Sequence, residues 1–306
     1  MNTKEKAPIC LFVYNRPEHT RRTVDALRSN IFADESDLII FADGPKSDEQ
    51  AAKVSEVRQY IKGIKGFKSV SINEHETNLG LANSVINGVS LVVNKFGRII
   101  VLEDDLLTSP YFLSYMNDAL DLYETVEKVV SVHGYVYPVN EHLPETFLLP
   151  GADCWGWATW SRGWDCFNSD GQFLRDELRR RELEHVFDYN GSYPFVEMLE
   201  GQVNGENDSW AIRWYASAFL LEKLTLYPGR SLVENIGNDS SGTHCEESSA
   251  FNVRLSDGPI ILDRVKIESS YMGMKAFEKY FKRICTGNIG PLRRLLRKIQ
   301  RYFNHL

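Results

Sequence analysis

A short apolar run that ends in three adjacent acids constrains the fold of this chain more than any other feature. Residues 99–102 read Ile-Ile-Val-Leu, and Glu103, Asp104 and Asp105 follow directly. Four apolar residues bounded by polar ones are typical of a strand buried inside a parallel sheet. In open α/β sheets, ligands bind beyond the carboxyl ends of the strands. We therefore expect the three acids to lie at the ligand-binding edge of such a sheet.

Three neighbouring carboxylates repel one another, so bringing them together requires a counter-charge. Mg²⁺ or Mn²⁺ would supply it, because these cations take hard oxygen ligands and are commonly held by one or two carboxylates plus substrate phosphates. The alternative interpretation is a solvated acidic turn. The buried strand in front of the acids favours the metal.

The first hundred residues alternate between predicted strands and predicted helices. Strands are expected over 8–14, 37–42 and 67–72, and helices over 20–27, 49–61 and 81–96. Short connections between such elements predict parallel strands joined by right-handed crossovers. Neither G-x-G-x-x-G after the first strand nor G-x-x-x-x-G-K-[ST] occurs. A standard dinucleotide site and a P-loop are therefore unsupported.

The next part of the chain is expected to extend the same α/β domain. Helices are predicted over 109–126, 172–187 and 209–223, and strands over 128–136, 224–227 and 231–236. Residues 141–152 are expected to form a loop or an edge strand, and residues 189–207 a loop or a short helix. We see no internal repeat and no long linker.

Charge is distributed unevenly over the 306 residues. The net charge is −7, yet residues 275–301 hold nine Lys or Arg and a single acid, Glu278. From Pro291 onwards the apolar residues fall on one helical stripe and cations fill the rest. A basic amphipathic helix of this kind binds an anionic membrane surface. Packing against the acidic body of the protein is the alternative.

Other features of composition indicate where such a chain would work. No apolar run approaches the roughly 20 residues of a membrane span, and the first ten residues lack the apolar core of a signal peptide. The five cysteines are irregularly spaced and include no C-x-x-C pair, which favours reduced thiols. We therefore expect a cytoplasmic protein, peripheral on the inner face of the cell membrane. We expect no nucleic-acid partner.

Several segments, taken in order, resemble the GT-A glycosyltransferases. VLEDDL resembles the DxD-type motif, and the chain is similar to bacterial family 2 glycosyltransferases and to the N-acetylglucosaminyltransferase I family. The matching segments are VYNRPEHTRRTVDAL, FADGP, NLGLANSVINGV, VLEDDLLTSPYFLSYM, PGADCWGWATW and NDSWAIRW, which span roughly residues 8–245. The resemblance implies a GT-A fold, a Rossmann-like and mostly parallel sheet flanked by helices. It would occupy residues 1–268, with a nucleotide-binding half at 1–107, an acceptor-binding half at 108–268, and a basic tail at 269–306.

The resemblance also implies roles for the three acids. In the family, the last acid of the motif binds the metal that bridges the diphosphate of the donor, and this position is Asp105 here. The metal acts as a Lewis acid on the leaving group. Asp104 and Glu103 would face the ribose and the donor sugar.

Further donor-site residues follow from the resemblance. They are Tyr14, Asn15, Arg16, Asp43, Asn78, Gly80 and Asn83. Arg16 could contact a phosphate or the base, or form a salt bridge at a helix start. Asp43 would accept the uracil N–H, and it could form a turn as well. Asn78 could bind the ligand or cap a helix, and Gly80 would allow close backbone approach.

The resemblance assigns the acceptor side less firmly. Inverting transfer needs a general base that takes the proton of the acceptor hydroxyl, and Asp208 in NDSW matches that position. Glu206 is the alternative base, and a helix N-cap is the alternative role of Asp208. Trp157 is expected to face the acceptor or donor, although core packing is the default for aromatic residues. His244 could add a metal or diphosphate contact, or it could be structural.

The resemblance thus implies a metal-dependent, inverting glycosyltransferase with a UDP-sugar donor. The acceptor would be a glycan, lipid-linked if the basic helix binds a membrane, in a bacterial surface polysaccharide such as O-antigen or capsule. A nucleotidyltransferase is one alternative, but it would carry a Gly-rich signature with a Lys where this chain has Asn15-Arg16-Pro17. A non-catalytic carbohydrate-binding or assembly protein is the other. The presence of all three acids and Asp208 disfavours it.

Overall fold

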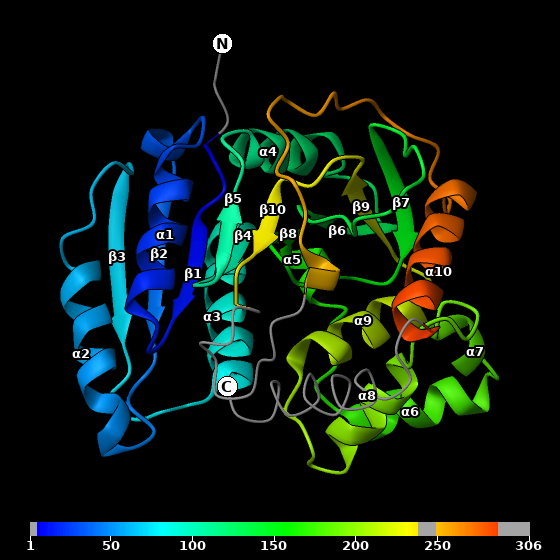
Figure 1. Ribbon diagram of the computed structural model, residues 1–306, viewed down its shortest axis with the longest axis horizontal. Helices are drawn as coiled ribbons and strands as arrows, with labels where there is room; N and C mark the ends of the chain where they lie inside the picture. Colours follow the sequence, from blue (N-terminus) through cyan, green and yellow to red (C-terminus); the bar gives the residue numbers. More distant parts are fainter. Residues whose placement is uncertain (1–4, 238–248, 287–306) are drawn as a thin grey trace.

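The computed structural model describes residues 5–237 and 249–286, and a central sheet flanked by helices organises them (Figure 1). The main sheet has eight strands in the order β3-β2-β1-β4-β8-β6-β9-β7, and β10 pairs with β5 in a small second sheet. The strands are β1 (Ile9–Val13), β2 (Asp37–Ala42), β3 (Ser69–Glu74), β4 (Arg98–Glu103), β5 (Leu106–Thr108), β6 (Val129–His133), β7 (Thr146–Pro150), β8 (Trp157–Trp160), β9 (Leu224–Pro228) and β10 (Val233–Asn235). The helices are α1 (Pro17–Arg28), α2 (Asp48–Ile61), α3 (Leu81–Phe96), α4 (Phe112–Leu122), α5 (Ser161–Trp164), α6 (Gly171–Arg180), α7 (Glu184–Phe187), α8 (Phe195–Val203), α9 (Trp210–Leu220) and α10 (Tyr271–Thr286).

The first half of the sheet is parallel, as the alternation of strands and helices predicts. β1 pairs in parallel with β2 and with β4, and β2 pairs in parallel with β3. The bounds of β2 and α3 are those expected from the sequence. Helix α1 begins at Pro17, where the fixed backbone angle of proline suits the first helical turn. The expected fold class, a mostly parallel α/β sheet flanked by helices, is confirmed.

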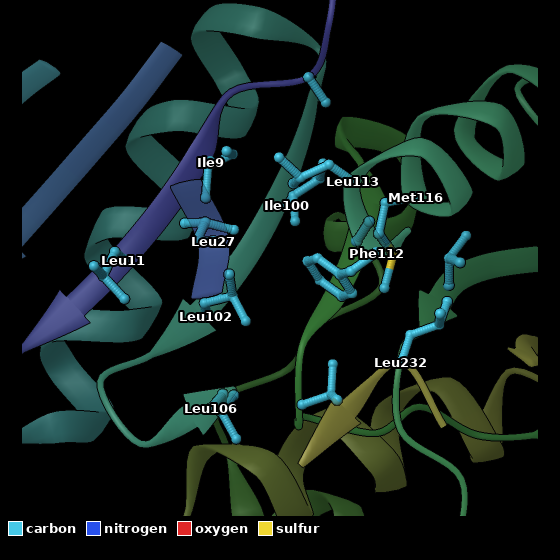
Figure 2. Close-up of a cluster of buried hydrophobic side chains, with 14 of the residues drawn as sticks. Ile9, Leu11, Leu27, Ile100, Leu102, Leu106, Phe112, Leu113, Met116 and Leu232 are labelled. Atoms are coloured by element: carbon cyan, nitrogen blue, oxygen red, sulfur yellow. The ribbon is translucent and has the colours of Figure 1, made fainter. Parts of the chain in front are cut away.

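Strand β1 is apolar along its whole length because both of its faces are covered. Ile9 and Leu11 point into a core that includes residues of α1 and α4, part of which Figure 2 shows. Cys10 and Phe12 point the other way, into a core with the buried face of α3. Burial on both faces removes the polar alternation that a half-exposed strand would show.

Strand β8 joins the two halves of the sheet, and the sequence did not predict it. It is antiparallel to both β4 and β6, whereas β6 and β9 run parallel to each other. All four of its residues are buried. A short, fully apolar run gives no period-two pattern, so its sequence alone does not distinguish it from a buried loop.

Helix α10 belongs to the folded body. Its buried residues Ala276, Phe277, Tyr280 and Phe281 are part of a core that also contains residues of β7, α6 and α9. Although residues 269–306 are expected to form a basic tail, this helix packs against the domain. The stretch from Pro291, where we expect the basic amphipathic helix, lies outside the described residues. Within the part of the chain that is described, no helix has both the length and the apolar character of a membrane span.

Candidate active site

Residues from the carboxyl ends of three parallel strands meet in one pocket. Tyr14 and Arg16 follow β1, Asp43 follows β2, and Glu103 ends β4 with Asp104 and Asp105 directly behind it. The pocket is lined by Phe12, Val13, Tyr14, Arg16, Phe41, Asp43, Leu81, Ser84, Glu103, Asp104 and Asp105. The three acids therefore lie at the edge of the parallel sheet, as the sequence predicts.

Asp104 is held by groups at the start of α1. Its Oδ2 accepts from the backbone N–H of Tyr14 at 3.3 Å and lies 3.5 Å from the hydroxyl of Thr20. Its carbonyl oxygen accepts from the hydroxyl of Thr23 at 2.8 Å. These contacts hold the turn after β4, which carries the acids, against the loop after β1 and the start of α1.

Asp105 forms an ion pair with Arg16. Arg16 Nη1 lies 2.9 Å from Asp105 Oδ2, and the two side chains are 11% and 9% exposed. The carbonyl oxygen of Asp105 accepts from the backbone N–H of Ile236 at 2.9 Å, which ties the strand β10 to the same corner. A Cβ atom on Gly237 would come within 2.1 Å of Asp105 Oδ2, so a side chain there would displace the carboxylate.

The site concentrates more negative charge than its arginine can offset. Burial, together with repulsion between the neighbouring carboxylates, raises the pKa of Glu103 to about 8 and that of Asp104 to about 7, although Arg16 opposes both shifts. Carboxylate oxygens that lack a counter-charge suit a divalent cation. The described residues form no preformed cluster of three or more His, Cys, Asp or Glu ligands. The carboxylate oxygens of this site therefore fit a cation that one or two carboxylates share with substrate phosphates.

Asp43 organises the segment that leads into α3. Its Oδ1 accepts from the backbone N–H groups of Gly44 and Leu79, both at 2.9 Å. Its Oδ2 accepts from the side chain of Asn78 and the N–H of Gly80, both at 3.0 Å. Asn78 is thus a partner of Asp43, and Gly80 adopts the φ of +78° that starts the helix. A uracil N–H would be a fifth donor to this carboxylate.

The other predicted donor-site residues lie around the pocket with different exposure. The hydroxyl of Tyr14 accepts from the N–H of Lys46 at 2.9 Å and donates to Gln50, so its ring is anchored. Asn15 is partly buried, and Asn83 is exposed and donates to the carbonyl of Leu79 at 3.0 Å. Neither Asn15 nor Asn83 lines the pocket.

Ser84 is a pocket residue that sequence reasoning missed. Its hydroxyl is buried, it lies on α3 where the helix faces the pocket, and it has no hydrogen-bond partner among the described residues. A buried hydroxyl without a partner is uncommon, so its position at a pocket wall favours a bound ligand as its partner. The helical pattern assigns Ser84 to a face of α3 but gives no hint of this role.

The predicted catalytic carboxylates lie before α9. Asp208 and Glu206 are both exposed, and neither lines the pocket. Ser209 is the N-cap of α9, since its side chain accepts from the N–H of Ile212, so Asp208 is not the cap. Asp208 Oδ1 lies 3.1 Å from Nη2 of Arg213, a buried arginine that also donates to the carbonyl of Ser209. The arginine holds the carboxylate in one orientation while leaving it open to solvent.

Trp157 does not face a cleft, and this prediction is corrected. Its side chain is fully buried, and its ring centroid lies 5.6 to 6.0 Å from those of Trp164, Trp210 and Trp214. Gly156, with a φ of +65°, lets the chain turn so that Trp157 enters the core. Trp155, on the other side of the glycine, stays partly exposed. His244 lies outside the described residues.

Replacing Trp157 by alanine is expected to reduce stability. Loss of a fully buried Trp leaves a cavity and should lower the free energy of unfolding by about 3–5 kcal/mol. The indole N–H has no partner among the described residues, so Trp157→Phe should cost much less. Denaturant-induced unfolding of both variants measures the difference. A Trp157→Ala variant with unchanged stability and a higher acceptor KM would instead support the expectation that Trp157 faces the acceptor.

The sheet order and the acids that close β4 define a GT-A type of fold. A family model, Glycosyl transferase family 2, matches residues 9–180. Because the match covers more than half of the chain, the chain belongs to glycosyl transferase family 2. The family membership expected from the motifs is confirmed.

Comparison with solved structures gives distant matches. The mannosyltransferase PcManGT from Pyrobaculum calidifontis, in complex with GDP-Man and Mn²⁺, is 12% identical over 57% of this chain and 46% of that chain, with a TM-score of 0.36. S. aureus TarS is 12% identical over 48% of this chain and 25% of that chain, with a TM-score of 0.29. TarS 1–349 is 10% identical over 57% and 49% of the two chains, with a TM-score of 0.33. The chain spans at most about half the length of these structures. Comparison with curated proteins finds no match.

Proposed function

We propose that this chain transfers a sugar from a UDP-sugar to a glycan acceptor, with inversion at the anomeric carbon. The observation that carries the proposal is the pocket that holds Glu103, Asp104, Asp105 and Arg16 at the carboxyl ends of β1 and β4. Ligands of open α/β sheets bind at this edge. A sugar nucleotide brings a diphosphate, which needs the cationic groups that such a pocket can assemble.

In this proposal Mn²⁺ or Mg²⁺ is held by Asp105 together with the diphosphate of the donor. When bound, the cation would offset the charge that develops on the leaving diphosphate. Arg16, which lies 2.9 Å from Asp105, is placed to contribute a second positive charge to the same phosphates. Glu103 and Asp104 would face the donor sugar and the ribose. His244 remains a proposed further contact.

The base of the nucleotide would occupy the part of the pocket near Asp43. The four donors to Asp43 are three backbone N–H groups and the side chain of Asn78, and one of them could give way to the uracil N–H. Ser84 offers a hydroxyl with no partner in the described structure, which could bond to the nucleotide. Tyr14, anchored at its hydroxyl, would form the wall on the side of β1.

Transfer would proceed by attack of an acceptor hydroxyl oxygen on the anomeric carbon. As that bond forms, the bond between the anomeric carbon and the diphosphate oxygen breaks, and its electron pair leaves with the UDP. The proton of the acceptor hydroxyl passes to a carboxylate, for which Asp208 is the proposed base. Its ion pair with Arg213 supports this role because the pair fixes the orientation of the carboxylate.

The acceptor is proposed to be lipid-linked, in the synthesis of a bacterial surface polysaccharide at the inner face of the cell membrane. This part of the proposal rests on the sequence after Pro291, with its basic residues and apolar stripe. It predicts faster transfer to a glycan on a lipid in anionic vesicles than to the same glycan free in solution.

Incubation of the full chain with a panel of UDP-sugars and Mn²⁺, followed by measurement of released UDP, tests the proposal. We expect release from one donor, faster with an acceptor, and lost when EDTA removes the metal. Release of diphosphate from a nucleoside triphosphate and a sugar phosphate would instead identify a nucleotidyltransferase. Binding of sugars without turnover of any nucleotide would identify a carbohydrate-binding protein. Full activity in EDTA would contradict the role of the metal.

A further inference from the structure

The loop between β7 and β8 runs beside the acids of β4. The antiparallel pairing of β4 with β8 ends with Val101 opposite Trp157. The chain that leads into β8 therefore passes the point where β4 leads into its acids. The pKa of Cys154 agrees with this placement, because it is raised first by burial and then by the charges of Asp153, Glu103 and Asp105.

Asp153, in this loop, is a carboxylate surrounded by neutral donors. Its Oδ1 accepts from the N–H of Cys154 at 2.8 Å, and its Oδ2 lies 3.4 Å from the hydroxyl of Tyr227 and 3.5 Å from that of Tyr137. No Lys or Arg of the described residues pairs with it. Its side chain is 21% exposed, so part of it is accessible to solvent.

The ring of His133 lies next to Asp153. It is completely buried, and its Nε2 accepts from the N–H of Trp155 at 3.0 Å. In the neutral ring the proton must then sit on Nδ1, which lies 3.7 Å from Asp153 Oδ2. Burial lowers the pKa of His133, against the opposing effect of Asp153, so the ring stays neutral. The groups that contact the Asp153 carboxylate, namely the Cys154 N–H, the hydroxyls of Tyr137 and Tyr227 and the His133 ring, are thus all uncharged.

Trp155 supplies an aromatic surface next to this carboxylate. Its ring lies edge-on to Tyr135, with centroids 4.8 Å apart, and to Phe251, at 5.7 Å. The side chain is partly exposed. A partly exposed carboxylate and a partly exposed indole two residues apart in one loop suit a sugar, whose hydroxyls can donate to the carboxylate and whose C–H face can cover the ring.

We propose that Asp153 and Trp155 form the subsite for the acceptor sugar, and that they select a neutral sugar over an acidic one. The inference rests on the proposed function, since it places the acceptor beside the donor pocket. Asp153 would accept from a sugar hydroxyl while Trp155 supports the ring. A uronic acid would bring its carboxylate toward that of Asp153, where like charges repel in a poorly solvated site.

Saturation-transfer NMR with the full chain tests this subsite. The probes are a mixture of methyl glycosides of neutral hexoses, and methyl glucuronide measured separately. We expect at least one neutral glycoside to bind the wild type and the glucuronide not to bind. Asp153→Asn should weaken the neutral glycoside roughly tenfold, because it removes a hydrogen bond to a charged group. Equal binding by the two proteins, no binding of any neutral glycoside by the wild type, or preference for the glucuronide would overturn the inference.

Two further variants make the result specific. Trp155→Leu should also lose the NMR signal of the neutral glycoside. This variant tests the subsite independently if Asp153→Asn folds poorly. Asp188→Asn is the matched control, since Asp188 is also a partly buried carboxylate that accepts a backbone N–H but lies in another loop. It should bind the glycoside as the wild type does. UDP binding with Mn²⁺, measured on the same proteins, reports separately on the proposed function and should be unchanged in all three variants.

Discussion

Replacing Asp105 by asparagine should reduce sugar transfer by about 1,000-fold or more. A cation at a leaving group contributes several kcal/mol to the transition state, and each 1.4 kcal/mol is about a factor of ten in rate. Asparagine keeps the size of the side chain and one oxygen that can accept from Arg16. It removes the charge that would hold the metal. The loss should therefore appear in kcat and in the effect of Mn²⁺ on UDP binding.

The decisive measurement on Asp105→Asn is UDP affinity with and without Mn²⁺. In the wild type we expect Mn²⁺ to strengthen UDP binding, and in the variant we expect it to have no effect. Asp118→Asn, at an exposed position of α4, is the control and should behave as the wild type does. Because removing one partner of a buried ion pair also destabilises a fold, the melting temperatures must be compared. A folded Asp105→Asn variant with full activity would contradict the proposal that Asp105 holds the metal.

Asp208→Asn should lower kcat by roughly 100- to 10,000-fold, the usual contribution of a general base. The KM for the UDP-sugar should stay nearly constant, because Asp208 is outside the donor pocket. Asparagine can still accept from Arg213, so the start of α9 should keep its structure. Steady-state kinetics of sugar transfer by the variant and by the wild type measure both constants.

Glu206→Gln is the matched test of the alternative base. Glu206 is exposed in the same loop, and no contact of its side chain is described. If Asp208 is the base, Glu206→Gln should retain activity within about twofold, as expected of a surface substitution. An inactive Glu206→Gln beside an active Asp208→Asn would exchange the two roles. Two active variants would place the base elsewhere on the acceptor side.

The first, parallel half of the sheet could be predicted from sequence because its signals are local. A strand buried on both faces, such as β1, is a continuous apolar run, and each helix that follows carries its own stripe. The acids after β4 stand out for the same reason. Their position at the sheet edge follows from the parallel topology, which short alternating elements impose.

The second half of the sheet was harder to predict because its geometry depends on long-range pairing. The local sequence of Trp157–Trp160 does not indicate that this strand lies between β4 and β6. The backbone turn at Gly156 decides which neighbouring indole is buried, and sequence gives only that a glycine is present. Helix α10 shows a related limit. Its apolar face and basic residues suit a membrane as well as a protein core, and only the fold reveals that residues such as Phe277 meet a core.

The insertion of β8 between β4 and β6 has a consequence for how this enzyme could evolve or be redesigned. The two regions of the sheet are hydrogen-bonded to each other through β8, whose neighbours β4 and β6 each lie about 4.8 Å away. The loops of the second region could be exchanged while the strand pairing of the first region is kept. The two regions could not be expressed as separate fragments, because each would expose a long unpaired edge where the other had been.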